Sequence, residues 1–135
     1  MALEVGDIDE ALEWYGKIFE LELRGRMGNA MAFVDMGDQF IALMETKSSH
    51  SDKHRHFGLV VDDRSRVREL ARAAGATLLE GDFLDFLDPW GNRIEVVEYR
   101  NVQFSKAPAV LRGMKFADLD KSEDAQKQLA DKGMK

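Results

Sequence analysis

The sequence has no cysteine among its 135 residues, which excludes disulfide bonds, thiolate metal sites and a cysteine nucleophile. It has only two prolines, and no apolar run approaches the roughly 18 residues that a membrane-spanning helix requires. Its first residues do not have the pattern of a secretory signal peptide. We therefore expect a cytoplasmic protein without a membrane partner.

The chain also lacks an excess of basic residues. The chain has 19 Lys and Arg against 25 Asp and Glu, which gives a net charge of −6, and the acidic excess lies in residues 1–100. Proteins that bind nucleic acid present a basic surface, so a nucleic-acid partner is excluded. With 44% hydrophobic residues, the chain has enough apolar material for the core of one ordinary domain. A small-molecule ligand is the partner class that we expect.

The first hundred residues contain an internal repeat. The matched blocks are 2–7 with 58–63, 33–35 with 86–88 and 41–45 with 94–98. The first pair is offset by 56 residues and the other two pairs by 53 residues. Because a loop can absorb the change of offset between the blocks, the pattern predicts two copies of one structural unit.

Each half of the repeat predicts a strand, a helix and three further strands. Asp7 and Asp63 are placed to cap the two helices, and Gly75 is placed to end the second one. Apolar side chains recur at helical spacing in the first half, at Ile8, Ala11, Leu12, Tyr15 and Phe19. The later strands are predicted at 21–24, 30–35, 40–45, 77–80, 83–87 and 93–99.

The fold class is therefore α+β, with two tandem βαβββ modules at residues 1–46 and 54–99 that form one domain at 1–99. Residues 46–53 are polar and read as the linker between the modules. Residues 100–135 form a C-terminal extension, in which Asp120 or Ser122 can cap a short helix that runs to Ala130 and is stopped by Gly133. Its apolar side chains are expected to pack on the body or on a second subunit.

This tandem pattern resembles the vicinal oxygen chelate superfamily, which contains glyoxalase I, bleomycin-resistance proteins, methylmalonyl-CoA epimerase and extradiol dioxygenases. The resemblance covers residues 1–99 and depends on VGDIDEALEWY at residues 5–15 and FLDPWGNRIE at residues 86–95. It implies eight strands in a curved sheet that lines a cavity. It also implies a homodimer, in which the modules pair either within one chain or between subunits.

The resemblance further implies a divalent metal site, for Fe, Mn, Zn or Ni. His56 matches a histidine ligand of the family, and Glu95 matches its glutamate ligand. Because side chains alternate along a strand, both can face the cavity while Phe57 and Ile94 face the other way. The remaining histidines, His50 and His54, are expected at the surface.

The repeat supplies no third ligand within this chain. Glu95 corresponds to Ala42, and His56 corresponds to the position immediately before Met1. Two alternatives stay open. Either the site has degenerated into a metal-free pocket, or a histidine upstream of Met1 completes a set of two histidines and one carboxylate. The position of Ala42 is likewise not a ligand in extradiol dioxygenases.

Asp85 is the candidate catalytic residue. It stands ten residues before Glu95, where extradiol dioxygenases carry a tyrosine, and an acidic side chain there could act as a general base. The alternative is an ordinary polar residue of the strand. The cavity wall is predicted to include Glu4, Phe40, Ala42, Met44 and Phe83.

Two functions follow from the resemblance. The first is a metal-dependent enzyme, a lyase, an isomerase or a dioxygenase, that acts on a small substrate chelating the ion through adjacent oxygens. The second is a metal-free protein that sequesters a planar or hydrophobic small molecule, as the antibiotic-resistance members do.

Overall fold

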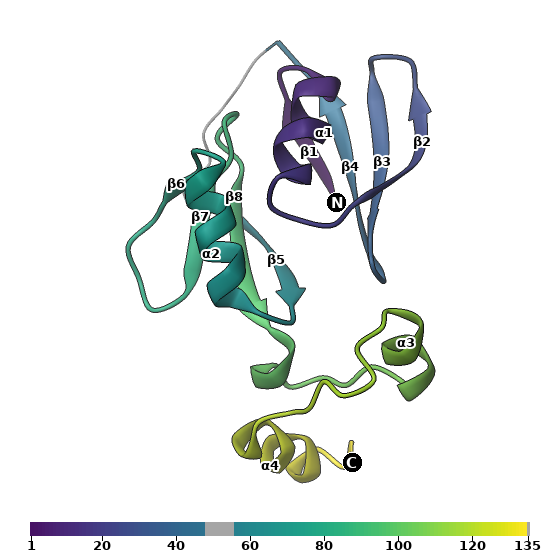
Figure 1. Ribbon diagram of the computed structural model, residues 1–135, viewed down its shortest axis with the longest axis vertical. Helices are drawn as coiled ribbons and strands as arrows, with labels where there is room; N and C mark the ends of the chain where they lie inside the picture. The colour runs from purple at the N-terminus through teal and green to yellow at the C-terminus, as the bar shows by residue number, and fades with distance from the viewer. Residues whose placement is uncertain (48–55, 135) are drawn as a thin grey trace.

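The computed structural model describes residues 1–47 and 56–134 (Figure 1). The first module consists of β1 (Ala2–Val5), α1 (Ile8–Gly16), β2 (Glu22–Met27), β3 (Met31–Met36) and β4 (Gln39–Glu45). The second consists of β5 (His56–Val61), α2 (Arg64–Ala73), β6 (Thr77–Leu78), β7 (Leu84–Leu87) and β8 (Arg93–Glu98). The extension adds η1 (Tyr99–Asn101), α3 (Pro108–Gly113) and α4 (Glu123–Asp131). His50 and His54 lie outside the described residues.

The two modules have the same topology, which confirms the α+β class and the tandem βαβββ arrangement. The eight strands form two four-stranded sheets, with orders β1-β4-β3-β2 and β5-β8-β7-β6. In each sheet the first and last strands of the module are parallel neighbours, and the remaining neighbours are antiparallel.

The registers of the paired strands show which residues of the two modules are equivalent, and so test the offsets of the internal repeat. Ala2 pairs with Ala42 and Gly58 pairs with Glu95, so the offsets of 56 and 53 residues are confirmed for the first and last strands. The match of residues 33–35 with 86–88 is wrong. Val34 pairs with Ile41 and Phe86 pairs with Ile94, which places Phe86 over Val34 at an offset of 52 residues. Six residues separate Val34 from its partner Ile41, whereas seven separate Phe86 from its partner Ile94, so one inserted residue in the second hairpin accounts for the difference.

The boundaries of α1 and α2 are set by capping residues close to them in the sequence. The side chain of Asp7 accepts a hydrogen bond from Glu10 N at 2.9 Å, and that of Asp63 accepts one from Arg66 N at 3.0 Å. These carboxylates satisfy amide groups that the first turn leaves unpaired. After α2 the chain turns away at Gly75, whose φ of +79° favours glycine.

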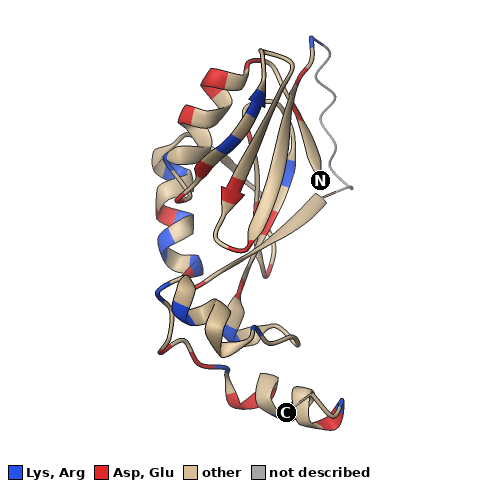
Figure 2. Ribbon diagram, turned by 90° about the vertical axis from the view of Figure 1, so that its right-hand side faces the viewer, with Lys and Arg blue, Asp and Glu red and all other residues tan. Residues whose placement is uncertain are grey.

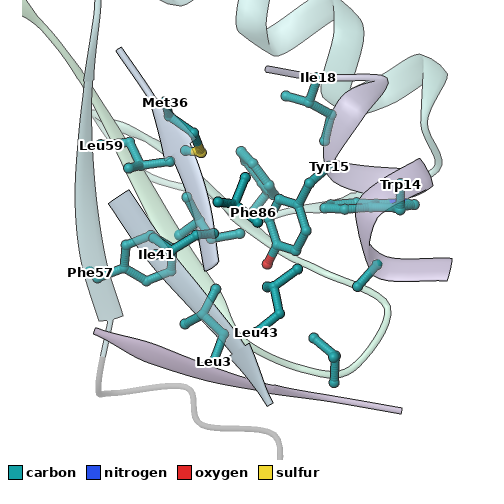
Figure 3. Close-up of a cluster of buried hydrophobic side chains, with 14 of the residues drawn as sticks. Leu3, Trp14, Tyr15, Ile18, Met36, Ile41, Leu43, Phe57, Leu59 and Phe86 are labelled. Atoms are coloured by element: carbon teal, nitrogen blue, oxygen red, sulfur yellow. The ribbon is translucent and has the colours of Figure 1, made fainter. Parts of the chain in front are cut away.

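One hydrophobic core joins the two modules. Figure 2 shows α1 and α2 on the same side of the sheets, so that neither helix covers the opposite face, which we call the open face. On the helix side, buried side chains from both modules pack together (Figure 3). The labelled residues include Leu3, Trp14, Ile41, Leu43, Phe57, Leu59 and Phe86.

Two hydrogen bonds between equivalent positions of the repeat link the modules within the chain. Asn92 Nδ2 donates to Glu4 O at 2.8 Å, and Gln39 Nε2 donates to Val60 O at 3.1 Å. Gln39 corresponds to Asn92, and Glu4 corresponds to Val60, so the two contacts are equivalent. In addition, Trp14 Nε1 donates to Ala74 O at 2.9 Å. The two modules of one chain therefore dock directly on each other.

Tyr15 makes a buried contact between α1 and the turn after β7. Its hydroxyl donates to Asp88 Oδ2 at 2.6 Å, and the side chain has no exposed surface. Burial of the phenol, together with the Asp88 carboxylate beside it, raises the pKa of Tyr15 well above its usual value of 10.0.

This shift predicts alkaline destabilisation. The folded protein holds the phenol proton more tightly than the unfolded chain, so stability that is fully present below pH 10.0 decreases as the pH rises above that value. We expect the urea midpoint to fall between about pH 9 and about pH 11, and to fall less in Tyr15→Phe. Equal decreases in both proteins would contradict the assignment.

The C-terminal extension contains the predicted helix and one that was not predicted. α4 is capped by Ser122, which accepts from Ala125 N at 3.3 Å, and it buries Leu129. The short α3 was not predicted, although Ala107, Val110, Leu111 and Met114 have helical spacing and Pro108 stands in its first turn. Met114, just after α3, lies so close to Gly37 that a side chain there would clash with its methyl group. Within the described ranges, no helix is both long and apolar enough to span a bilayer.

Candidate functional site

The two predicted metal ligands meet on the open face of the second sheet. β5 and β8 are adjacent and parallel, and their register places Gly58 directly beside Glu95, two residues along from His56. His56 Nε2 lies 2.9 Å from Glu95 Oε2. The side chains are 37% and 25% exposed, so a small ligand can approach them from solvent. The alternation predicted from sequence therefore brings this pair together.

The chemistry of the pair fits a divalent cation. An imidazole nitrogen and a carboxylate oxygen are donors that Zn, Mn and Fe accept. Two donors that each lie about 2.1 Å from an ion, at a right angle, are about 3 Å apart, which agrees with the separation of His56 and Glu95. Among residues 1–47 and 56–134, however, no cluster of three or more acidic, histidine or cysteine side chains is positioned to hold an ion. The described protein donors are therefore two, and a ligand would have to supply others.

Asp85 lies on the same face, next to the pair. It is directly opposite Glu95 in the register of β7 and β8. Arg93 Nε donates to Asp85 Oδ2 at 2.8 Å, and Arg93 Nη2 contacts the same oxygen. Asp85 is only 7% exposed. A carboxylate on the solvent-facing side of a sheet is thus buried and held by an arginine that sequence reasoning did not single out.

Arg93 could have been found by the same alternation that found Glu95. It precedes Glu95 by two residues and therefore shares its face. It is also the register partner of His56. The open face of the second sheet thus carries four neighbouring ionisable side chains, in which basic and acidic groups lie side by side. They are His56, Glu95, Asp85 and Arg93.

A hollow of about 460 Å³ lies beside this set, at the junction of the two modules. It is lined by Met1, Asp38, Gln39, Phe40, Ile41, Phe57, Gly58 and Leu59. Gly58, the register partner of Glu95, has open space where a side chain would be. The hollow therefore borders the strand that carries His56, but its lining includes neither His56 nor Glu95.

The predicted cavity residues occupy different parts of the two sheets. Phe40 lines the hollow and is 56% exposed. Ala42 and Met44 follow it on the same face of β4, and Met44 is the register partner of Glu4. Phe83, just before β7, is 57% exposed. Their contact with a ligand stays a prediction.

A larger cleft of about 960 Å³ lies elsewhere. It is bounded by the end of α1, the start of α2 and the C-terminal extension, and its lining includes none of the residues predicted for the site. Because it contains neither His56 nor Glu95, the cleft is not the candidate metal centre.

Comparison with known proteins decides the family. The sequence profile described as the Glyoxalase/Bleomycin resistance protein/Dioxygenase superfamily matches residues 1–96. The chain belongs to this superfamily. No curated protein of known function matches the sequence.

Solved structures of the superfamily share the fold. The possible glyoxalase from Bacillus cereus is 26% identical, with 72% of this chain and 94% of that chain covered and a TM-score of 0.59. The lactoylglutathione lyase from Agrobacterium tumefaciens is 23% identical, with 73% and 90% covered and a TM-score of 0.58. A mutant of the fosfomycin resistance protein FosX from Listeria monocytogenes is 19% identical, with 70% and 85% covered and a TM-score of 0.62. That structure contains Mn(II) and 1S,2S-dihydroxypropylphosphonic acid.

Proposed function

We propose that this member of the superfamily is a metal-dependent enzyme of the glyoxalase or dioxygenase kind, which acts on a small molecule that chelates the cation through two adjacent oxygens. One observation carries the proposal. His56 Nε2 and Glu95 Oε2, from strands that are adjacent only in the fold, converge to 2.9 Å on a face that ligands can reach. Such a separation suits two neighbouring ligands of one ion.

Each part of the site has a role in the proposal. His56 and Glu95 hold the cation, which when bound would polarise substrate oxygens as a Lewis acid. Gly58 leaves room for the substrate, and Phe40 supplies an apolar wall in the adjoining hollow. Asp85 lies across from Glu95 and is the candidate proton acceptor for a carbon acid or hydroxyl of the substrate.

The first cation to test is Mn(II), because the FosX neighbour was solved with it. We expect the purified protein, stripped with chelator and reloaded, to take up one Mn(II) per chain by elemental analysis. His56→Ala removes one of two protein donors and should abolish this uptake. Asp35→Asn is a matched control, because Asp35 is a half-exposed carboxylate of the first sheet, 3.8 Å from Arg24. Stoichiometric Mn(II) in His56→Ala would contradict the assignment.

A metal-free binding protein is the second candidate. Two observations favour it, the absence of a three-donor cluster among the described residues and the apolar hollow beside Gly58. Under this alternative His56 and Glu95 are only a hydrogen-bonded pair. The same titration distinguishes the two functions, because the alternative predicts no uptake of Mn, Fe, Zn or Ni and binding of a planar aromatic dye that Phe40→Ala weakens.

A homodimer and a cytoplasmic location complete the proposal. Large apolar side chains are exposed on or near the open face, at Met27, Phe40, Met44 and Phe83. Burial of such side chains against a second copy would remove them from water, which favours association.

A further inference from the structure

The cleft of about 960 Å³ lies between the C-terminal extension and the two modules. The end of α1, the end of β5 and the start of α2 line it on the side of the modules, and residues that follow β8 complete the lining. Figure 1 shows the extension below both sheets. Small-molecule sites in proteins have volumes of about 300–1,000 Å³, so the cleft is large enough for such a ligand. Neither His56 nor Glu95 lines it, so a ligand there would be independent of the proposed function.

Apolar side chains line the cleft on both sides. The modules contribute buried residues, among them Ile18 and Leu59. The extension contributes Leu111, Met114 and Phe116, each of which is partly exposed. An apolar molecule placed among these side chains would remove more of their surface from water, which is favourable. The chemistry of the lining therefore favours an apolar ligand.

The extension is fastened at two points, so the cleft is a preformed space. Lys106 forms an ion pair with Asp38, in the turn between β3 and β4. Lys121 Nζ donates to Val102 O at 3.0 Å and lies 3.5 Å from the centre of the Tyr99 ring. Residues 107–120, which we call the strap, run between these two lysines and supply most of the lining residues of the extension.

The end of α3, within the strap, has a defined backbone conformation. Phe116 N donates to Leu111 O at 2.8 Å and Lys115 N donates to Arg112 O at 3.0 Å, which are the two bonds of a Schellman motif. Lys115 has the positive φ, +63°, that this motif requires. The residues at the positions of Leu111 and Phe116 commonly contact each other in the motif, and here both line the cleft. A fixed backbone therefore presents these two apolar side chains.

The polar groups of the lining indicate an uncharged ligand. Lys17 and Lys106 are paired with carboxylates outside the lining. Among the described residues, the buried side-chain atoms without a hydrogen bond are Asp85 Oδ1 and Gln128 Oε1, and neither residue lines the cleft. Charges of both signs make up the rest of the charged lining, so that neither an anion nor a cation is favoured. These residues are Arg66, Lys115, Glu20, Asp62 and Asp63.

We propose that the cleft binds an uncharged, mainly apolar small molecule between the strap and the two modules. The apolar lining supplies the affinity, and the fastened strap keeps the space open before the ligand arrives. Binding there requires no metal ion and does not involve His56 or Glu95. The protein therefore has a second site, for a class of ligand different from the one that chelates a cation.

Two dyes with the same aromatic rings test the class of ligand. N-phenyl-1-naphthylamine is uncharged, and 1-anilinonaphthalene-8-sulfonate differs from it by one sulfonate group. Both dyes fluoresce more strongly in an apolar site than in water. In fluorescence titrations of the purified, metal-free protein, the uncharged dye should bind one per chain and at least about tenfold more tightly than the sulfonate, because burial of a charge is unfavourable.

Substitutions on α3 locate the site. Leu111→Asp places a carboxylate in the apolar lining and should weaken binding of the uncharged dye at least about tenfold. Val110→Asp is the matched control, because Val110 is the preceding residue, is 37% exposed and does not line the cleft. Its affinity should stay within about twofold of wild type. The core cluster that joins the modules includes no described residue of the strap, so both variants should retain the fold of the modules.

Phe40→Ala separates the cleft from the hollow on the open face. Phe40 lines that hollow but not the cleft, so this variant should retain its affinity for the uncharged dye. Loss of binding in Phe40→Ala, equal weakening in Leu111→Asp and Val110→Asp, equal affinities of the two dyes, or no binding of the uncharged dye to the wild-type protein would each overturn the inference. Failure of Mn(II) to bind would instead overturn only the proposed function.

Discussion

Asp88→Ala should lower the free energy of unfolding by about 3–4 kcal/mol, which is among the larger effects of single substitutions. The Asp88 side chain accepts four hydrogen bonds in a buried position. Removing it leaves the Tyr15 hydroxyl without an acceptor inside the core and frees the turn between β7 and β8. Because that turn contacts β1 through Asn92, the docking of the modules should weaken with it. Thermal unfolding should show a midpoint lower by roughly 10 °C.

Asp62 offers a matched control for this prediction. It is an exposed carboxylate that follows β5, and Asp62→Ala should change the free energy of unfolding by less than about 0.5 kcal/mol. If Asp88→Ala were as mild as the control, the buried network around Asp88 would not contribute to stability as argued.

Glu95→Ala should reduce Mn(II) affinity at least about 100-fold, since even the loss of a residue that supports a metal ligand costs 10–100-fold. The fold should tolerate the change. Glu95 is partly exposed and opposes another carboxylate, so its removal also relieves repulsion from Asp85. We expect the free energy of unfolding of the metal-free protein to stay within about 0.5 kcal/mol of wild type. Calorimetric Mn(II) titration and urea unfolding measure the two quantities.

Glu98 is the control on the same strand. Its side chain accepts from Arg64 N at 3.1 Å, at the start of α2, and takes no part in the proposed site. Glu98→Gln should retain Mn(II) affinity. A similar loss of affinity in Glu95→Ala and Glu98→Gln would point to a general effect of charge rather than to coordination.

The fold could be predicted because its signals are local. Asp7 and Asp63 cap their helices through amides three residues away, and Gly75 ends α2 through its own φ angle. The repeat then fixed the order of the strands. Its one error, the match of residue 33 with residue 86, arose because an inserted residue in a turn leaves no mark on the composition of the strands beside it.

The contacts between modules could not be predicted from the sequence. Trp14 falls outside the apolar stripe expected for α1, yet it is buried against Ala74, 60 residues away. Tyr15 was expected in the core, but its bond to Asp88 spans 73 residues. Such pairs depend on how two finished modules dock, which no local pattern encodes.

The candidate site could be predicted only in part, because its side-chain contacts also depend on tertiary packing. Strand alternation placed His56, Glu95 and Asp85 on one face, and the register of β5, β7 and β8 brings them together. Alternation alone does not reveal that Arg93 binds Asp85 or that one oxygen of Asp85 stays unsatisfied. Those features depend on side-chain conformations that follow from packing.

Pulsed electron paramagnetic resonance of the Mn(II)-loaded protein tests the central claim most directly, because it detects histidine nitrogen bound to the ion. The chain has three histidines, and only His56 is proposed as a ligand. We predict nitrogen modulation from a single imidazole in the wild-type protein and in a double variant with His50→Ala and His54→Ala, and its loss in His56→Ala. Bound Mn(II) without nitrogen modulation in the wild-type protein, or modulation that persists in His56→Ala, would contradict the account.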